Sequence, residues 1–229
     1  MNKYGILGWP LERSYSPIIH TFLLKHASIE GNYELIKLNE INNKNIDHIN
    51  NNYSGYNITI PYKEKILEVS EGAHLDVHVE KIGSVNTVKN KDGITSFHNT
   101  DYLGFLNFLE IINFNPEGRT IMTLGSGGSS KAIKYALNLM NAETTIVSRT
   151  NKVEAISYQD LNDRANEVDV LINTTPIGMP PYENETLDIN IENFNNLELV
   201  MNIGYGSNNN FLSLFNDSIQ KFDGLGMLI

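Results

Sequence analysis

A glycine-rich turn lies between an apolar run and a helical pattern in the second half of the chain. It reads Gly125-Ser126-Gly127-Gly128-Ser129-Ser130, with the apolar run at 120–124 before it and the helical pattern at 132–140 after it. In this order of strand, turn and helix, glycines let the backbone turn tightly and approach a pyrophosphate, which the helix N-terminus attracts. A small residue at the last fingerprint position, here Ser130, allows close packing of helix against strand. The motif therefore predicts a dinucleotide-binding site.

An arginine follows the next apolar run, which spans residues 144–147, in the sequence Ser148-Arg149-Thr150. Sites that prefer NAD usually carry an acidic residue at this position, where it hydrogen-bonds the ribose. An arginine beside two hydroxyls suits a 2′-phosphate instead, and this segment contains no carboxylate to repel it. We interpret the pattern as an NADP site. A purely structural turn and a solvated strand-end charge are the alternatives, since a lone glycine fingerprint is a weak signal.

A second set of polar residues lies at the ends of elements predicted in the first hundred residues. The two-residue period of a strand over 56–60 places Asn57 and Thr59 on one face and the isoleucines on the other. Lys63 follows near the start of a predicted helix, where a cation opposes the helix dipole. Asp101 precedes an apolar helix. Short polar side chains together with one lysine and one aspartate suit a polyhydroxylated acid and a proton donor near a carbonyl being reduced.

Each of these residues also has a simpler structural interpretation. Asp101 could cap the helix that follows it, and Ser16 could cap a helix with Pro17 at its first position. Lys63 could be an ordinary exposed lysine. The functional interpretation therefore depends on the whole set rather than on any one residue.

Composition narrows the class of protein. The chain has 229 residues, 41% hydrophobic and 19% charged, which is ordinary for a globular protein. Its net charge of −10 argues against nucleic acid as a partner, although Arg149 and Lys152 can still hold an anion locally. No cysteine is present, so disulfides, cysteine-bound metals and cysteine nucleophiles are excluded.

The sequence gives no evidence for a metal site, a signal peptide or a membrane-spanning segment. His74 and His78 are four residues apart, but no strong third ligand accompanies them, so we expect no metal. The first residues lack the apolar stretch of a signal peptide, and no run has membrane-spanning length. We therefore expect a cytoplasmic protein with a small-molecule substrate and no membrane partner, as a monomer or homodimer.

Hydrophobic periodicity predicts two α/β domains, 1–101 and 102–229, with a connecting helix and turn over 102–118. In the first domain we expect strands at 4–8, 32–38 and 56–60, helices at 17–25, 46–52 and 62–69, and a hairpin of strands 84–88 and 94–97. In the second we expect strands at 120–124, 144–147 and 155–158, a helix at 132–140, and a short turn or helix near 159–166.

The chain resembles the shikimate dehydrogenases in a series of segments that run in the family's order. They are Gly8–His20, Gly55–Lys63, Ile82–Thr87, Asn99–Gly104, the glycine turn, Ser148–Thr150, Asn173–Met179 and Asp223–Leu228. The resemblance implies an N-terminal substrate domain, a Rossmann-type NADP-binding domain and a cleft between them. It also implies the reversible NADPH-dependent reduction of 3-dehydroshikimate to shikimate, a step of aromatic amino-acid biosynthesis.

The resemblance also implies roles for individual residues. Lys63 would be catalytic, paired with Asp101. The substrate carboxylate would be held by Ser14 and Ser16, and the ring hydroxyls by Thr59, Asn86 and Asp101, with Asn57 and Tyr205 close to the substrate. The cofactor residues would be Gly125, Ser126, Gly127, Gly128 and Ser129 at the pyrophosphate, Ser148, Arg149, Thr150 and Lys152 around the 2′-phosphate, and Ile203, Gly226 and Met227 near the nicotinamide.

The chain departs from the family pattern in three places. Residues 151–172 leave room for fewer elements than the family has, which could loosen adenine binding, and Asn202 stands where the family commonly has an acid. The family also continues past Met227-Leu228 with a substrate-binding glutamine and a helix, whereas this sequence stops at Ile229. We expect weaker substrate binding, by about 1–3 kcal/mol, and apolar surface on the first domain unless a partner or subunit covers it.

Two alternatives to a shikimate dehydrogenase therefore stay open. One is a non-catalytic relative that binds NADP or shikimate without turnover, and the other is an enzyme that acts on quinate. Retention of both Lys63 and Asp101 favours an enzyme.

Overall fold

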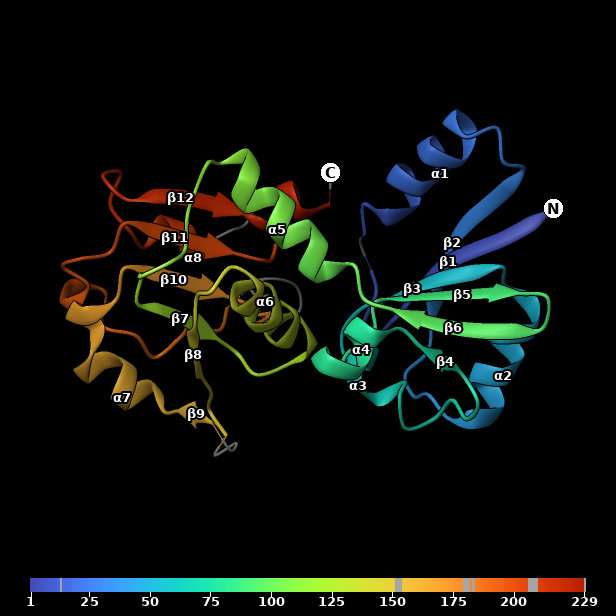
Figure 1. The fold of residues 1–229 in the computed structure, drawn as a ribbon, viewed down its shortest axis with the longest axis horizontal. Helices are drawn as coiled ribbons and strands as arrows, with labels where there is room; N and C mark the ends of the chain where they lie inside the picture. Colours follow the sequence, from blue (N-terminus) through green and yellow to red (C-terminus); the bar gives the residue numbers. More distant parts are fainter. Residues whose placement is uncertain (13, 151–153, 179–181, 183, 206–209, 229) are drawn as a thin grey trace. The chain divides into compact units, whose positions relative to one another are not determined.

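A computed structural model describes the chain except for residues 13, 151–153, 179–181, 183, 206–209 and 229. The chain forms two compact units, Met1–Thr100 and Asp101–Ile229. Each unit has its own six-stranded sheet with helices beside it (Figure 1). The structure thus confirms the predicted class of two α/β domains.

The sheet of unit 1 is mixed, with the strand order β2-β1-β3-β5-β6-β4. Its strands are β1 (Asn2–Gly8), β2 (Gly31–Lys37), β3 (Gly55–Ile58), β4 (His74–Leu75), β5 (Thr87–Lys91) and β6 (Ile94–His98). β1 pairs in parallel with β2 and β3, whereas β5 runs antiparallel to both β3 and β6. The carboxyl ends of β1, β3 and β6 and the amino end of β5 therefore share one edge of the sheet.

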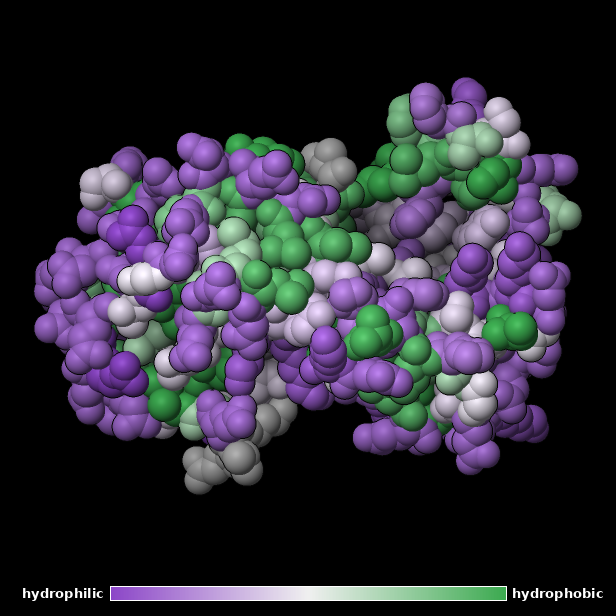
Figure 2. Space-filling view, in the orientation of Figure 1, coloured by the Kyte–Doolittle hydropathy of each residue, from purple (hydrophilic) through white to green (hydrophobic). Residues whose placement is uncertain are grey.

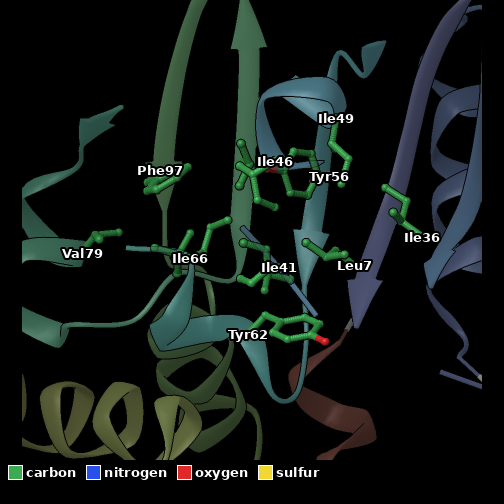
Figure 3. Packing of buried hydrophobic residues seen from close by; sticks show 13 residues of the cluster. Leu7, Ile36, Ile41, Ile46, Ile49, Tyr56, Tyr62, Ile66, Val79 and Phe97 are labelled. Carbon is green, nitrogen blue, oxygen red and sulfur yellow. The ribbon is translucent and has the colours of Figure 1, made fainter. Parts of the chain in front are cut away.

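Apolar side chains from the strands and helices of unit 1 form its core. The helices are α1 (Ser16–His26), α2 (Asn43–Asn52), α3 (Tyr62–Lys65) and α4 (Val77–Ile82). Figure 3 shows side chains from β1, β2, β3, β6, α2, α3 and α4 gathered in one cluster. Polar α2 joins this cluster through Ile46 and Ile49, and a capping box between Asn42 and Asn45 fixes its first turn.

Helix α1 presents apolar side chains on the surface instead of burying them. None of its residues is buried, and Ile18 and Phe22 are 70% and 67% exposed. Figure 2 shows the resulting apolar surface over α1, among otherwise polar atoms. The helix contacts β1 and β2, so its inner face is only partly shielded.

The sheet of unit 2 is parallel throughout and has the strand order β9-β8-β7-β10-β11-β12. Its strands are β7 (Ile121–Leu124), β8 (Thr144–Val147), β9 (Ala155–Ile156), β10 (Val170–Asn173), β11 (Leu199–Asn202) and β12 (Gln220–Asp223). In chain order this is the 3-2-1-4-5-6 arrangement of a Rossmann fold. The direction of chain progression reverses between β7 and β10, where such sheets bind their ligands.

The helices of unit 2 are α5 (Asp101–Ile111), α6 (Gly128–Leu139), α7 (Tyr158–Asp163) and α8 (Asn210–Ser213), with short 3-10 turns η1 (Ala165–Glu167), η2 (Ile191–Asn193) and η3 (Gly224–Met227). In the chain, α5 precedes the strands of unit 2, η3 follows them, and the other helices lie between them. α5, the predicted connecting helix, buries Phe105, Phe108 and Leu109. No helix among the described residues is long and apolar enough to cross a membrane.

Several predicted boundaries in unit 1 were wrong. Helix α3 ends at Lys65 rather than at 69, because the following amides bond three residues back, as from Leu67 to Glu64. The strands of the hairpin span 87–91 and 94–98, joined by Asp92 and Gly93, both with positive φ. β4 and α4 were not predicted.

Two boundaries in unit 2 also differ from the prediction. Helix α6 begins at Gly128, four residues before the predicted start, so the glycine turn leads directly into its first turn. β9 ends at Ile156 because the Ser157 hydroxyl accepts from the amide of Asp160 and starts α7. The described part of the segment between β8 and β10 thus holds a two-residue strand, a six-residue helix and the short turn η1, in agreement with the short spacing.

Candidate active site

In unit 1 the predicted substrate residues gather at one edge of the sheet. Ser14 and Ser16 follow β1, Thr59 and Lys63 follow β3, and Asn86 directly precedes β5. Because these strand ends share an edge, the fold brings together residues that are far apart in the sequence. Asp101 begins α5 as the first residue of unit 2.

A chain of hydrogen bonds fixes Asn57 within this edge. The Tyr33 hydroxyl on β2 donates to Asn57 Oδ1 at 2.7 Å. Asn57 Nδ2 donates in turn to the Thr87 hydroxyl at 3.2 Å and to the Asn86 carbonyl at 3.4 Å. Asn57 is therefore held on both sides of its amide, and its rotamer is set by neighbouring strands.

Asn86 is buried and ties β5 to the end of β6. Its Oδ1 accepts from the Thr100 amide at 2.8 Å and from the Thr87 hydroxyl at 2.9 Å. Its Nδ2 donates to the Thr100 hydroxyl at 2.9 Å, and its backbone bonds both Ile58 and His98. An amide bonded at both ends of its side chain is pre-organised for recognising a ligand.

Lys63 lies on the short helix α3 with a half-buried side chain. Its carbonyl accepts from the Val85 amide at 2.7 Å, which joins α3 to the segment that leads into Asn86. The predicted pairing of Lys63 with Asp101 joins residues of the two units and stays a prediction. Asp101 lies inside the first turn of α5, so the helix begins at the aspartate itself.

The two serines lie at the start of α1. Ser14 Oγ accepts from the Ser16 amide at 3.1 Å, and Tyr15 is the N-cap residue. The structural alternative in which Ser16 caps the helix is therefore wrong, because Ser16 already belongs to the first turn. Thr59 lies just past β3, where its methyl group fills the space beside Gly8.

In unit 2 the glycine turn requires its glycine at the position where the fold reverses. Gly125 has φ of +101°, and a Cβ there would lie 2.7 Å from Thr174 Oγ1 and 3.1 Å from Thr175 Cγ2. Thr174 directly follows β10, so the turn packs tightly against the neighbouring strand end. Only a residue without a side chain satisfies both conditions.

Beyond Gly125 the turn passes into a twelve-residue helix. Gly127 is the N-cap of α6, without a side-chain hydrogen bond to the first turn, and Gly128 and Ser129 are its first residues. Amides at the start of a helix attract phosphate groups. Ser130 is buried between helix and sheet, as close packing requires. These features match what a pyrophosphate needs, so the residues present fit a dinucleotide.

Hydroxyl groups line the adjacent end of β8. Ser126 Oγ lies 3.1 Å from Ser148 Oγ, which lies 3.2 Å from Thr150 Oγ1. The Thr150 amide also donates to Ser148 Oγ at 3.3 Å. The glycine turn and the arginine motif thus form one continuous polar surface. Lys152, the other predicted cation, lies outside the described residues.

Arg149 is exposed beside this surface, but an acid accompanies it. The Arg149 Nη1 atom lies 3.7 Å from Glu185 Oε2. Arg149 also acts on the nearby Tyr158 hydroxyl: burial raises the pKa of this hydroxyl, and the Arg149 charge offsets part of that rise. The expectation that no carboxylate opposes a phosphate here was based on the local segment and was wrong. Glu185 comes from the loop after β10, which sequence spacing could not place.

The ends of β10, β11 and β12 complete the polar edge of unit 2. Asn173 Nδ2 donates to Asn202 Oδ1 at 3.0 Å, and both side chains are buried. Asn202 thus forms a neutral amide pair with Asn173, at the position where the family commonly has an acidic residue. Ile203 follows directly, and its amide donates to the Asn173 carbonyl at 2.8 Å.

The η3 turn, which contains Gly226 and Met227, is packed closely against its neighbours. A Cβ on Gly224 would collide with the Ile203 carbonyl, and one on Gly226 with the Phe108 ring. A Cβ on Gly104 of α5 would lie 2.6 Å from the Met227 carbonyl. These contacts hold Ile203, Gly226 and Met227 near one another, whereas Tyr205 lies in the loop just after Ile203.

Sequence reasoning missed residues that support the site from other strands. Tyr33 and Thr100 were not predicted to take part, yet both hold amides of the substrate edge. Their partners lie 24 and 14 residues away, so no local periodicity indicates them. Among the described residues no cluster of histidines and acids could hold a metal ion.

Comparison with known proteins identifies the family that shares this geometry. The model of the shikimate dehydrogenase substrate binding domain matches residues 6–88. A shikimate dehydrogenase (NADP(+)) from Methanococcus vannielii is 34% identical, over 98% of this chain and 86% of that protein. The chain belongs to the shikimate dehydrogenase family. A second such relative, from Clostridium perfringens (strain 13 / Type A), is 33% identical over the whole chain and 89% of its own length.

Solved shikimate dehydrogenases share the fold. Shikimate dehydrogenase 1 from Peptoclostridium difficile has a TM-score of 0.85 at 26% identity, covering 100% of this chain and 87% of that one. The enzyme from Thermus thermophilus, solved in complex with NADP(H) and shikimate, has a TM-score of 0.82 at 25% identity, covering 100% and 89%. The parallel sheet with its glycine turn and the mixed sheet of unit 1 are thus those of a shikimate dehydrogenase.

Proposed function

We propose that this protein catalyses the reversible, NADP-linked interconversion of shikimate and 3-dehydroshikimate in aromatic amino-acid biosynthesis. The observation that carries the proposal is the shared edge of the unit 1 sheet, where Asn57, Asn86 and Lys63 converge. Similarity along nearly the whole chain to shikimate dehydrogenases (NADP(+)) supports it. In this proposal residues 1–101 bind the substrate and residues 102–229 bind the cofactor.

Lys63 handles the proton. NADPH, when bound, supplies the hydride that reduces the C3 carbonyl. The Lys63 ammonium stabilises the oxygen as it gains negative charge and donates a proton to it, and in the reverse direction the amine takes the hydroxyl proton back. Asp101 holds the ammonium in position. Lys63 is suited to this because α3 is anchored by its carbonyl to the segment that carries Asn86.

Short polar side chains orient the substrate. Thr59 and Asn86 bind the ring hydroxyls together with Asp101, and Asn57 lies close by. Ser14 and Ser16 at the start of α1 bind the carboxylate, and Tyr205 faces the substrate. Fixed amides select a polyhydroxylated ring because a ligand lacking a hydroxyl leaves a buried polar group without a partner.

The cofactor residues lie on the carboxyl edge of the parallel sheet. Backbone amides at Gly125–Ser129 hold the pyrophosphate, and Arg149 with Ser148, Thr150 and Lys152 binds the 2′-phosphate. Ile203, Gly226 and Met227 lie beside the nicotinamide. Because most of these contacts use backbone or small side chains, the turn geometry at Gly125 is their main requirement.

The test is the reduction of NADP by shikimate, followed as NADPH formation. Parallel assays replace NADP with NAD and shikimate with quinate. We expect turnover with shikimate and NADP to exceed every other combination. Folded protein that binds NADPH but produces none would identify a non-catalytic relative, and faster turnover with quinate would identify a quinate dehydrogenase.

A further inference from the structure

The acid beside Arg149 points to a second determinant of cofactor choice. Arg149 follows β8 at the edge where the 2′-phosphate is proposed to bind, and Glu185 lies 3.7 Å from its Nη1. Glu185 is held in place by its backbone, since its amide donates to the Tyr182 carbonyl at 3.1 Å, which also accepts from Gly178 at 3.0 Å. The carboxylate therefore belongs to a residue with a hydrogen-bonded backbone and lies next to the arginine.

The geometry of this ion pair fits competition better than pre-organisation of the arginine. The contact is long, it involves one guanidinium nitrogen, and the Arg149 and Glu185 side chains are 70% and 47% exposed. A pair that holds an arginine for a ligand is typically short, bidentate and shielded from water. Exposed pairs are weak, so a phosphate can displace the acid. The displaced carboxylate would still lie close to the phosphate and repel it.

We propose that Glu185 sets cofactor selectivity by competing with the 2′-phosphate for Arg149, so that the preference for NADPH over NADH is smaller than the arginine motif alone would give. This inference rests on the proposed function, because it assumes that the arginine motif binds NADP. Glu185 acts only on the cofactor that carries the extra phosphate. NADH has a hydroxyl at that position and gains little from removing the acid.

Binding titrations of the full chain with NADPH and with NADH test the inference without relying on turnover. Glu185→Gln removes the charge and keeps the shape. Glu198→Gln is the matched control, because Glu198 is equally exposed at 47% and pairs with Arg119 in the same unit. Glu198 directly precedes β11, and Arg119 lies shortly before β7. Both residues therefore lie at the amino ends of the strands, away from Arg149.

We expect Glu185→Gln to tighten NADPH binding about three- to tenfold and to change NADH binding less than about twofold. Glu198→Gln should change neither, and added salt should shrink the gain for NADPH. Unchanged or weaker NADPH binding in Glu185→Gln would overturn the inference. An equal gain in NADH affinity in Glu185→Gln, or in NADPH affinity in Glu198→Gln, would also overturn it. Each of these results leaves the proposed function intact. A wild type that binds no NADPH would remove both.

Discussion

The two sheets carry their candidate sites in different ways. In unit 1 the functional side chains bond one another, as Tyr33, Asn57, Asn86 and Thr100 do across four strands. In unit 2 the site is formed by a glycine turn, a helix start and hydroxyls, with an exposed Arg149 at its margin. In the proposed function, unit 1 therefore recognises one arrangement of hydroxyls through side chains, whereas unit 2 recognises phosphates mainly through its backbone.

This difference teaches where each site is sensitive to mutation. A network of buried amides fails when one side chain is removed, because its partners lose their hydrogen bonds. A backbone site fails when a side chain is added, because the backbone can no longer adopt its conformation. Small changes of charge at the margin should tune the second kind of site without destroying it.

The largest effect on ligand binding is expected from adding a methyl group at the glycine turn. Gly125→Ala forces a positive φ on alanine and places its Cβ 2.7 Å from Thr174 Oγ1. The backbone strain alone costs about 1–3 kcal/mol, and we expect NADPH affinity to fall by at least about tenfold. Shikimate affinity should be retained. Calorimetric titration with each ligand measures both.

Gly118→Ala is the control for this substitution. Gly118 also has a positive φ, of +76°, but nothing lies within 4 Å of the added Cβ. The Gly118→Ala variant should have a lower free energy of unfolding, because alanine disfavours a positive φ, and its NADPH affinity should not change. Equal loss of NADPH binding in both variants would show that general destabilisation, rather than the turn, is responsible.

Removing Asn86 should have the next largest effect, in the other unit. Asn86→Ala takes away the acceptor for the Thr100 amide at 2.8 Å and for the Thr87 hydroxyl at 2.9 Å. We expect a loss of about 1–3 kcal/mol in the free energy of unfolding and about tenfold weaker shikimate binding. NADPH affinity should not change.

Asn90→Ala provides the matched comparison within β5. Asn90 also bonds through both ends of its amide, to the Tyr53 carbonyl at 2.9 Å and from the Thr95 hydroxyl at 2.8 Å, but it lies at the opposite end of the strand. Denaturant unfolding should show a stability loss in both variants. Titration with shikimate should show weaker binding in Asn86→Ala but not in Asn90→Ala. Equal shikimate affinity in the two variants would contradict a substrate role for Asn86.

A smaller effect is expected at the outer end of the network. Tyr33→Phe removes the 2.7 Å hydrogen bond to Asn57 Oδ1 and keeps the aromatic ring. We expect about 0.5–1.5 kcal/mol less stability and a KM for shikimate raised about two- to fivefold, with kcat nearly unchanged. Steady-state kinetics would detect this. A drop in kcat at constant KM would argue that Asn57 is not a substrate-orienting residue.

The smallest effect is a pH dependence in unit 1. The His20 ring stacks on Tyr33 at 4.3 Å between centroids, and burial lowers the His20 pKa from its ordinary 6.5. Below 6.5 the unfolded chain takes up the proton more readily than the folded one, so stability falls as pH decreases through that region. Unfolding at several pH values should show a shallower decline in His20→Gln. An unchanged decline would exclude His20 as its source.

The sequence predicted the cofactor motif of unit 2 better than the polar network of unit 1, for a physical reason. Gly125, Ser130 and Arg149 are local signals, because strand, turn and helix follow one another directly in the chain. The polar network of unit 1 depends on the order β2-β1-β3-β5, which brings Tyr33 to Asn57 and Asn86 to Thr100. No local pattern encodes that order.

Other features could not be predicted because distant segments decide them. Glu185 lies beside Arg149 although it follows β10, so no pattern near the arginine indicates it. The early end of the helix at Lys63 has a local cause instead, because its later amides bond three residues back rather than four. The resemblance, and not strand periodicity alone, predicted that Asn57, Lys63 and Asn86 belong to one substrate site.

The central claim is that this chain is an NADP-linked shikimate dehydrogenase that uses Lys63 for proton transfer. The most direct test compares kcat for shikimate oxidation in the wild type, Lys63→Ala and Lys65→Ala, since Lys65 is an exposed lysine on the same helix. We predict that Lys63→Ala lowers kcat by about 10²–10⁴ with unchanged NADPH affinity, whereas Lys65→Ala is nearly wild type. Wild-type turnover that survives in Lys63→Ala would contradict the mechanism, and no turnover in folded wild type would contradict the claim itself.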